Sequence, residues 1–219
     1  MMKHPVQRIA TFTLFATLAC SLAPRFLQPV PTDPSTTPIL ISDFAAGQLD
    51  WWTDWTGEGA VDVSDGRLVL STRGVGSTAI AGHPDLKHLP GAYRIDISLR
   101  QVKGSGTSHF AIAFRNSDPE NLATIYISGN GSIALGVTLD GAYQEIIPWS
   151  HQTDPLSDAT IISFIDRGQT VELHVGSELV LLVPFEYLRP GEVYFYLGTY
   201  DTAEAVWEID AVSVTALAD

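Results

Sequence analysis

Short stretches of alternating apolar and polar residues, each ended by a turn, recur from Ile39 to the end of the chain. Successive side chains of a β-strand point to opposite faces, so a period of two predicts strands. No helical period longer than two turns competes with it. Strands are expected at Arg67–Ser71, Tyr93–Val102, His109–Arg115, Ala123–Ser128, Ser132–Leu139, Thr160–Asp166, Thr170–Val175, Glu178–Val183, Val193–Tyr200 and Ala205–Thr215. The sequence therefore predicts an all-β protein, a two-sheet antiparallel β-sandwich of the jelly-roll kind.

Turn residues lie between these strands. Gly and Asn tolerate the positive φ that tight hairpins require. They occur in Ser64-Asp65-Gly66, Lys103-Gly104-Ser105-Gly106, Gly129-Asn130-Gly131, Asp140-Gly141, Asp166-Arg167-Gly168 and Gly176-Ser177. Gly74-Val75-Gly76 predicts a further hairpin.

Strand parity separates a core face from a second face. The expected core side chains are Phe110, Ile112, Phe114, Ile125, Ile127, Leu135, Val137, Val193, Phe195 and Leu197. Trp51 and Trp55 share a parity and are also expected in the core. The second face combines small residues with aromatic ones, which is unlike a sheet face that only contacts water.

This second face is the candidate ligand-binding surface. Sugars bind through aromatic rings that cover their apolar face and through fixed polar groups for their hydroxyls. The expected ligand-binding residues are Tyr126, Tyr194, Tyr196, His109 and Arg115, with Trp52 and Trp149 contributed from loops. Ala111, Ala113 and Gly136 are expected to leave an open floor beneath the ligand. The alternative is that loops or a neighbouring molecule cover this face.

The N-terminus predicts an export signal. Residues 1–19 begin with Lys3 and Arg8 and continue into an apolar run that is too short for a comfortable membrane span. Cys20 ends that run and resembles the lipobox cysteine of bacterial lipoproteins, which becomes the lipidated first residue. The alternatives are ordinary cleavage, which would release a soluble exported protein, and an uncleaved segment that serves as an anchor. The predicted location is exported: a membrane-anchored lipoprotein at the cell surface, or a secreted protein.

The next segment predicts a tether. Residues 20–38 contain five prolines and few strongly apolar residues, so they favour an extended backbone. The expected organisation is a cleaved signal peptide at 1–19, a tether at 20–38 and one jelly-roll domain at 39–219. Contact with a membrane is expected only through the N-terminal lipid.

Charge and cysteine content exclude other classes. The chain has 12 Lys and Arg against 25 Asp and Glu, a formal charge of −13, which disfavours binding to nucleic acid. A single cysteine excludes an internal disulfide framework and a cysteine-based zinc site.

Several motifs resemble the concanavalin A-like lectin/glucanase superfamily, whose domains are laminin-G-like jelly rolls. They are Ile41-Ser42-Asp43-Phe44, the cluster Trp51 to Trp55, Asp65-Gly66-Arg67-Leu68, Asn121 through Ile127, Val171 through Gly176 and Trp207 through Val214. The resemblance covers about Ile39 to Leu217. It implies the fold and says little about chemistry, because this fold has many functions.

Two catalytic resemblances are incomplete. Glu208-Ile209-Asp210 resembles the start of the E-x-D-x-x-E signature of family-16 glycoside hydrolases, but Val212 or Ser213 stands where the last Glu is required. Tyr194 through Tyr200 resembles a segment of jelly-roll alginate lyases in which Tyr200 matches the catalytic Tyr. There, Tyr196 and Thr202 replace the Lys and Gln of the lyases. Catalysis is therefore uncertain, and no catalytic residue is assigned.

No cofactor is assigned, with one open question. The first and last strands are expected to be neighbours, which brings Asp43 and Asp210 together. Related binding modules hold a structural calcium between such acids, and acids held by hydrogen bonds are the alternative.

The function predicted from the sequence is a noncatalytic carbohydrate-binding or adhesive domain tethered at the cell surface. Its expected partner is a polysaccharide or glycan. The alternatives are a polysaccharide-degrading hydrolase or lyase and a structural envelope subunit that binds protein.

Overall fold

The computed structural model describes residues 37–45, 50–200 and 204–218. These ranges form antiparallel strands and one short 3-10 helix, which confirms the all-β prediction. The elements are β1 (Thr37–Ser42), β2 (Trp52–Ser64), β3 (Arg67–Gly82), η1 (Pro84–Leu86), β4 (Tyr93–Lys103), β5 (Ser108–Asp118), β6 (Asn121–Ser128), β7 (Ser132–Leu139), β8 (Ala142–His151), β9 (Thr160–Asp166), β10 (Thr170–Val175), β11 (Glu178–Pro184), β12 (Glu192–Thr199) and β13 (Ala205–Ala216). Within these ranges, no helix has the length and apolar character needed to cross a membrane.

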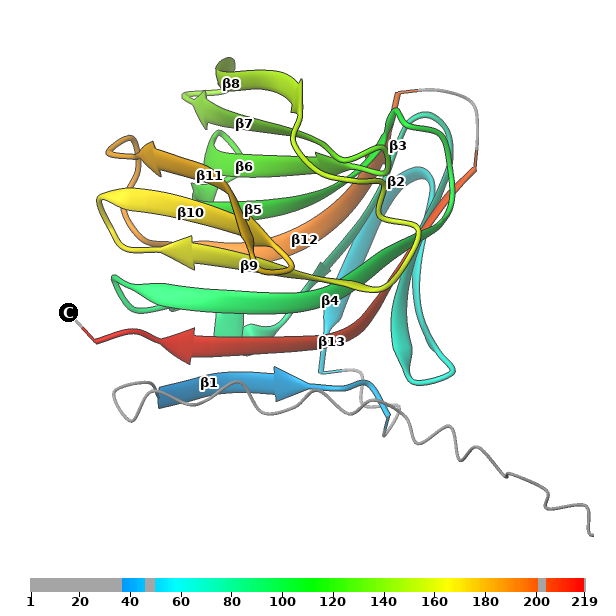
Figure 1. The fold of residues 1–219 in the computed structure, drawn as a ribbon, viewed down its shortest axis with the longest axis horizontal. Helices are drawn as coiled ribbons and strands as arrows, with labels where there is room; N and C mark the ends of the chain where they lie inside the picture. Colours follow the sequence, from blue (N-terminus) through cyan, green and yellow to red (C-terminus); the bar gives the residue numbers. More distant parts are fainter. Residues whose placement is uncertain (1–36, 46–49, 201–203, 219) are drawn as a thin grey trace, which may run out of the picture. The chain divides into compact units, whose positions relative to one another are not determined.

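The strands form one continuous sheet that curls into two layers (Figure 1). The β4 layer has the order β11-β10-β9-β4-β13, and β1 and the first half of β3 pair with β13. The β5 layer has the order β3-β12-β5-β6-β7-β8, with the second half of β3 at its start. β3 belongs to both layers, since residues 68–72 pair with β13 and residues 78–82 pair with β12. β2 pairs with β3 along both halves.

The passage from one layer to the other occurs where Gly74-Val75-Gly76 was expected to form a hairpin. That expectation is wrong, because β3 continues through these residues as a bulge. Gly74 and Gly76 have φ values of 85° and 75°, which bend the strand. Ser77 Oγ closes the bulge by donating to the carbonyl oxygen of Arg73 at 2.6 Å and accepting from the amide of Glu58 at 3.1 Å.

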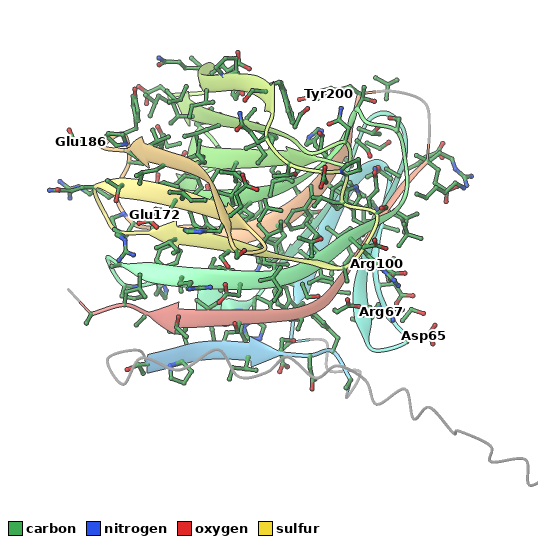
Figure 2. All side chains as sticks on the ribbon, in the orientation of Figure 1. Asp65, Arg67, Arg100, Glu172, Glu186 and Tyr200 are labelled. Carbon is green, nitrogen blue, oxygen red and sulfur yellow. The ribbon has the colours of Figure 1, made fainter. Side chains whose placement is uncertain are left out.

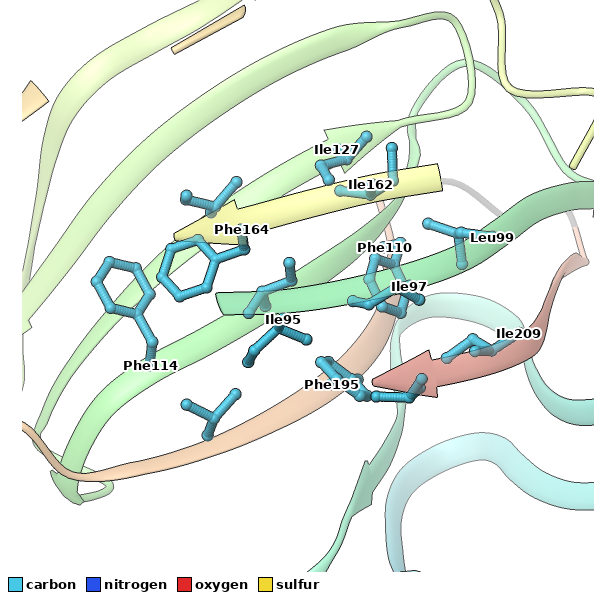
Figure 3. Packing of buried hydrophobic residues seen from close by; sticks show 14 of the residues in the cluster. Ile95, Ile97, Leu99, Phe110, Phe114, Ile127, Ile162, Phe164, Phe195 and Ile209 are labelled. Atoms are coloured by element: carbon cyan, nitrogen blue, oxygen red, sulfur yellow. The ribbon is translucent and has the colours of Figure 1, made fainter. Parts of the chain in front are cut away.

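The core lies between the layers and follows the predicted parity. Phe110, Ile112, Phe114, Phe195 and their predicted partners are fully buried or nearly so. Figure 3 shows aromatic and branched side chains from both layers meeting there. The ring centroids of Phe114 and Phe164 are 4.8 Å apart, which joins β5 to β9.

The two tryptophans expected in the core separate. Trp51 is buried and its ring centroid lies 5.7 Å from that of Phe195. Trp55 is 54% exposed, although its strand partner Ala79 is buried. In the described residues the first half of β2 pairs only with β3 and is therefore an edge strand. Trp55 has the parity of the core residues, but it lies at this edge, where the other layer does not cover it. The prediction was right for Trp51 and wrong for Trp55.

The chain enters the fold slightly earlier than expected. β1 begins at Thr37, two residues before the predicted start at 39, and pairs with the last strand, β13. The predicted signal peptide, the lipobox Cys20 and nearly all of the predicted tether lie outside the described residues.

Candidate functional site

Aromatic side chains gather on the outer face of the β5 layer. Cross-strand partners point to the same side of a sheet, and the register aligns Tyr196, Ala111 and Tyr126 on β12, β5 and β6. We call the set the aromatic face: Trp52, His109, Tyr126, Tyr143, Trp149, Tyr194, Tyr196 and Tyr200. Trp52 and Trp149 were expected in loops, but they lie on β2 and β8.

The rings of the aromatic face form a continuous series of contacts. Starting at β2, the centroid distances are 6.1 Å for Trp52–Tyr194, 6.4 Å for Tyr194–Tyr196, 6.2 Å for Tyr196–Tyr126 and 5.9 Å for Tyr126–Trp149. All are within the range of favourable aromatic contacts. The series therefore crosses the layer from the β2 side to β8.

His109 lies at the centre of this series. Its ring is stacked on Tyr200 at 4.9 Å and meets Tyr126 edge-on at 5.4 Å. Burial lowers the pKa of His109 to about 4, against an opposing effect of a backbone hydrogen bond with Thr107. The imidazole is therefore neutral at pH 7 and adds no charge to the aromatic face.

Small residues beneath the rings allow them to lie close to the sheet. A Cβ added at Gly82, Gly136 or Gly198 would come under 3.0 Å from the ring of Trp52, Tyr143 or His109, respectively. Ala111 and Ala113 are fully buried. The expected open floor above Ala111, Ala113 and Gly136 is thus wrong, because aromatic rings cover it.

Of the three most exposed rings on the aromatic face, only that of Trp149 was among the expected ligand-binding residues. Tyr143, Trp149 and Tyr200 are 55%, 40% and 65% exposed, whereas Tyr194 and Tyr196 are half-buried. Burial raises the pKa of Tyr194 and of Tyr143 to about 12, so both phenols stay neutral. A ligand would meet Tyr143, Trp149 and Tyr200 first.

Sequence reasoning missed Tyr143 and placed Tyr200 only through the lyase resemblance. The available signal for Tyr143 was the Asp140-Gly141 turn, which joins β7 to a further strand, β8. Pro148 argues against a strand at this place in the sequence, since proline inside a strand is tolerated mainly at a sheet edge. In the described residues β8 is the last strand of its layer.

Arg115 does not reach the aromatic face, which corrects the prediction. Its side chain is 1% exposed and forms an ion pair with Asp166 in the interior. Parity assumes a regular pleat, but Arg115 has a φ of 50° and the pairing of β5 with β6 shifts after Phe114. The left-handed residue turns the side chain from the outer face into the core.

The aromatic face carries no cationic side chain from its strands. Arg115 is the only Lys or Arg in β5, β6, β7, β8 and β12 and in residues 52–56 and 78–82, and it is buried. Asp54, Glu145 and Glu192 occur in the same segments. The surface is therefore neutral to acidic.

The incomplete hydrolase motif lies on the outer face of the other layer. Glu208 accepts hydrogen bonds from Arg100, and Asp210 accepts one from Arg67 at 2.6 Å. β13 is an internal strand there, between β3 and β4, so both acids lie in the interior of this layer rather than at its edge. Figure 2 shows Arg67 and Arg100 well apart from Tyr200.

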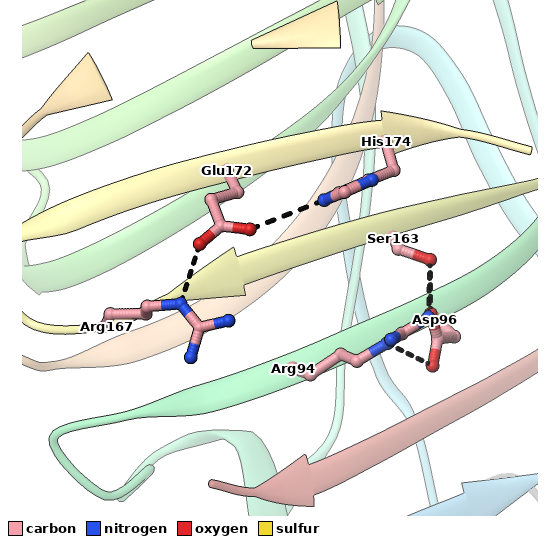
Figure 4. Close-up of polar contacts among 6 residues, drawn as sticks. All are labelled: Arg94, Asp96, Ser163, Arg167, Glu172 and His174. Carbon is pink, nitrogen blue, oxygen red and sulfur yellow. Dashed lines mark hydrogen bonds and ion pairs between the residues drawn. The ribbon is translucent and has the colours of Figure 1, made fainter. Parts of the chain in front are cut away.

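The same outer face carries further ion pairs (Figure 4). Arg94 donates to Asp96 at 2.9 Å, and Arg167 donates to Glu172 at 2.6 Å. Opposite charges thus neighbour one another across β4, β9 and β10. This arrangement is typical of a solvated sheet face.

The acids considered for calcium have protein partners. β1 and β13 are neighbours as expected. Asp43 accepts from the amide of Ala45 at 3.1 Å, while Arg67 and Ser98 contact the two carboxylate oxygens of Asp210. Among the described residues, no group of three or more His, Cys, Asp or Glu side chains is arranged to hold a metal ion.

Comparison with known proteins identifies the fold. No family model and no curated sequence matches the chain. Among solved structures it is similar to the carbohydrate-binding module CBM66 from Bacillus subtilis, with 13% identity, a TM-score of 0.54 and coverage of 70% of this chain and 91% of that one. It is also similar to the carbohydrate recognition domain of Emp46p in its potassium-bound form, with 14% identity, a TM-score of 0.58 and coverage of 79% and 91%.

A third similar structure is the β-glucanase of Bacillus licheniformis, with 10% identity, a TM-score of 0.59 and coverage of 80% of this chain and 96% of that one. These similarities show that the chain has the concanavalin A-like jelly-roll fold, as the sequence motifs predicted. Identities this low leave the function to be argued from the site.

Proposed function

We propose that this concanavalin A-like jelly roll binds a neutral polysaccharide or glycan on its aromatic face. The observation that carries the proposal is the continuous series of ring contacts from Trp52 to Trp149 on the outer face of the β5 layer. Stacked rings cover the apolar faces of sugar units, and tyrosine hydroxyls supply polar contacts. The similar carbohydrate-binding module and recognition domain support the proposal.

The charge of the aromatic face favours a neutral ligand. A polysaccharide that carries carboxylates or sulfates would need cations, and the strands that form this face contribute none. Net repulsion from a chain of charge −13 adds to this preference.

Removal of one exposed ring tests the proposal. Trp149→Ala should weaken binding to neutral polysaccharide about tenfold or more, since stacking on one aromatic ring contributes about 1–3 kcal/mol. Trp55→Ala is the matched control, because Trp55 is also exposed but points to the other side of its sheet. Affinity electrophoresis and calorimetry with soluble neutral glucans, galactans, mannans and chito-oligosaccharides measure both variants. An equal loss of affinity in Trp149→Ala and Trp55→Ala would contradict the proposal, and so would the absence of binding by the native protein.

Polysaccharide cleavage is the second candidate, and it is favoured by one observation. The neutral imidazole of His109 is stacked on Tyr200, the residue that the lyase resemblance matches to a catalytic tyrosine. Such a lyase needs a cation to neutralise the uronate carboxylate, and the described face has none. Absorbance of unsaturated products and release of reducing sugar separate binding from cleavage.

We also propose that the domain is exported and tethered through a lipidated Cys20, on the strength of the sequence of residues 1–38. Cys20→Ser should then release the protein from the membrane fraction. The intact mass of the mature form decides between the alternatives: an N-terminus at Ser21 or later without lipid would leave plain export. A pull-down from envelope extract tests the remaining alternative, a protein partner.

A further inference from the structure

A small pocket adjoins the aromatic face at the end of β12. It has a volume of about 250 Å³ and is lined by Gly106 and Thr107 of the β4–β5 loop, by the β6–β7 turn from Ser128 to Ser132, and by Trp149 and Tyr200. Pockets for drug-sized ligands measure about 300–1,000 Å³, so this one suits a single ring or a substituent. Trp149 and Tyr200 both contact His109, at 6.1 and 4.9 Å, which makes the pocket continuous with the aromatic face.

The pocket contains a polar group of fixed orientation, the side-chain amide of Asn130. Its Oδ1 accepts from the backbone amide of Ser132 at 3.0 Å and from the hydroxyl of Ser128. A backbone N–H can only donate, so the atom facing Ser132 must be the oxygen. The Nδ2 group therefore points the other way, towards Gly106, where an added Cβ would lie 3.2 Å from it.

The turn and loop that form the pocket are held by further hydrogen bonds. Gln101 donates from Nε2 to the carbonyl oxygen of Ser105 at 3.2 Å and to the hydroxyl of Ser108 at 2.5 Å. The amides of Gln152 and Leu156 donate to the carbonyl oxygens of Gly131 and Gly129, at 3.1 Å each. The β4–β5 loop is thus anchored to Gln101 of β4, and the β6–β7 turn to the segment between β8 and β9, so the pocket is a built feature of the fold.

From this arrangement we propose that the pocket recognises the acetamido group of a neutral 2-acetamido sugar. The proposal rests on the proposed glycan-binding function and specifies its ligand. The acetamido carbonyl accepts from Asn130 Nδ2, and the methyl group packs against the rings of Trp149 and Tyr200.

The composition of the pocket favours acetamido over the other common sugar substituents. A hydroxyl offers an acceptor to Asn130 but no apolar group for the two rings, which are 40% and 65% exposed. A carboxylate or sulfate would meet no cation, because none of the lining residues is Lys, Arg or His. An acetamido group has both an acceptor oxygen and an apolar methyl, and it is uncharged.

The test compares two ligands that differ only in this group. Chito-oligosaccharides and cello-oligosaccharides of equal length share their backbone and linkage, and only the former carry acetamido groups. Calorimetry should show the chito-oligosaccharide bound about tenfold more tightly, the effect of one additional hydrogen bond with its apolar contact. N-acetylgalactosamine and galactose, used as competitors, extend the comparison to a second sugar.

Asn130→Asp is the diagnostic variant. The carboxylate retains the oxygen that Ser132 needs, so the turn is preserved, but the N–H donor is lost. This variant should bind both oligosaccharides equally. Gln152→Glu is the control, since it adds the same charge near the pocket from a residue that does not line it, and it should keep the preference.

Three outcomes overturn the inference. They are equal affinities of the native protein for the two oligosaccharides, a preference that survives Asn130→Asp, and a preference lost equally in Gln152→Glu. One result would contradict the inference about the pocket and leave the proposed function intact. In it, the native protein binds neutral glucans, Trp149→Ala weakens that binding, and acetamido groups do not change the affinity. If no glycan binds, the proposed function fails with it.

Discussion

Arg115 and Asp166 form a two-pronged ion pair in the interior that joins the two layers of the sandwich. Arg115 Nε donates to Oδ2 of Asp166 at 2.8 Å and Nη2 donates to Oδ1 at 2.7 Å. The guanidinium also donates to the carbonyl oxygens of Phe185, Leu188 and Gly168, and its carbon lies 5.0 Å from the centroid of the Phe185 ring. One side chain from β5 thereby fixes the end of β9 and the segment between β11 and β12.

Breaking this pair should strongly destabilise the fold. Asp166→Asn removes the charge that compensates a buried guanidinium, which costs about 3–5 kcal/mol. Unfolding in urea measures the change. The control is Asp96→Asn on the outer face of the β4 layer, where the pair with Arg94 is partly exposed and contributes about 1 kcal/mol or less. Similar decreases in the free energy of unfolding of the two variants would contradict the structural role of the buried pair.

Adjacent residues of β12 should respond differently to truncation. Phe195 is fully buried and contacts Trp51 and Phe110, so Phe195→Ala should cost about 3–5 kcal/mol through the cavity that it leaves. Tyr196 points to the aromatic face, and Tyr196→Ala should reduce stability by less than half as much while weakening glycan binding. Thermal unfolding and calorimetry measure the two effects. An equal loss of stability would reverse the assignment of the two faces.

The stability of the native protein should decrease as the pH falls through the titration range of His109. Burial lowers the pKa of this residue from 6.5 to about 4, so the unfolded chain binds its proton first. The stabilisation by the neutral imidazole is complete above pH 6.5 and is lost progressively down to about pH 4. Its size is about 3 kcal/mol, from 1.36 kcal/mol per pKa unit.

His109→Gln isolates this contribution, because acidic residues also titrate as the pH falls. The difference in unfolding free energy between the variant and the native protein should change between pH 6.5 and pH 4 and stay constant above pH 7. A difference that is independent of pH would show that His109 is not held in its neutral form.

The sequence predicted the layers well because most strands keep a regular pleat. Alternation placed Phe110, Phe195 and Tyr196 on the correct faces. Arg115 was misplaced because a single left-handed residue inverts the parity, and a positive φ at arginine leaves no mark in the sequence. The continuous path of β3 was missed because Gly74 and Gly76 favour a bulge as well as a hairpin.

The candidate site was predicted only in part for a related reason. Parity assigns a face to each residue of a strand, which correctly grouped Tyr126, Tyr194, Tyr196 and His109. It does not show how far a ring leans over its neighbours. The position of the Tyr143 ring over Gly136 depends on a contact between two strands, and the orientation of Asn130 depends on hydrogen bonds within the β6–β7 turn.

The contact between Gly136 and Tyr143 leads to the last prediction. Gly136 on β7 has no side chain, and the ring of Tyr143 from β8 occupies the space that a Cβ would fill. Gly136→Ala should therefore force this ring away from the sheet. Because Tyr143 is 55% exposed, the ring can move into solvent, and the free energy of unfolding should change by about 1 kcal/mol or less.

Gly136→Ala should reduce the affinity for glycan more than the free energy of unfolding, because the displaced ring of Tyr143 no longer lies in line with the other rings of the aromatic face. The affinity for neutral glycan should decrease in Gly136→Ala to about the same extent as in Tyr143→Ala. The double variant should lose no more than either single variant, because both changes remove the same ring contact. Calorimetry on the native protein and the three variants gives a double-mutant cycle for the two residues. Additive losses would mean that Gly136 affects binding by a route other than the position of Tyr143.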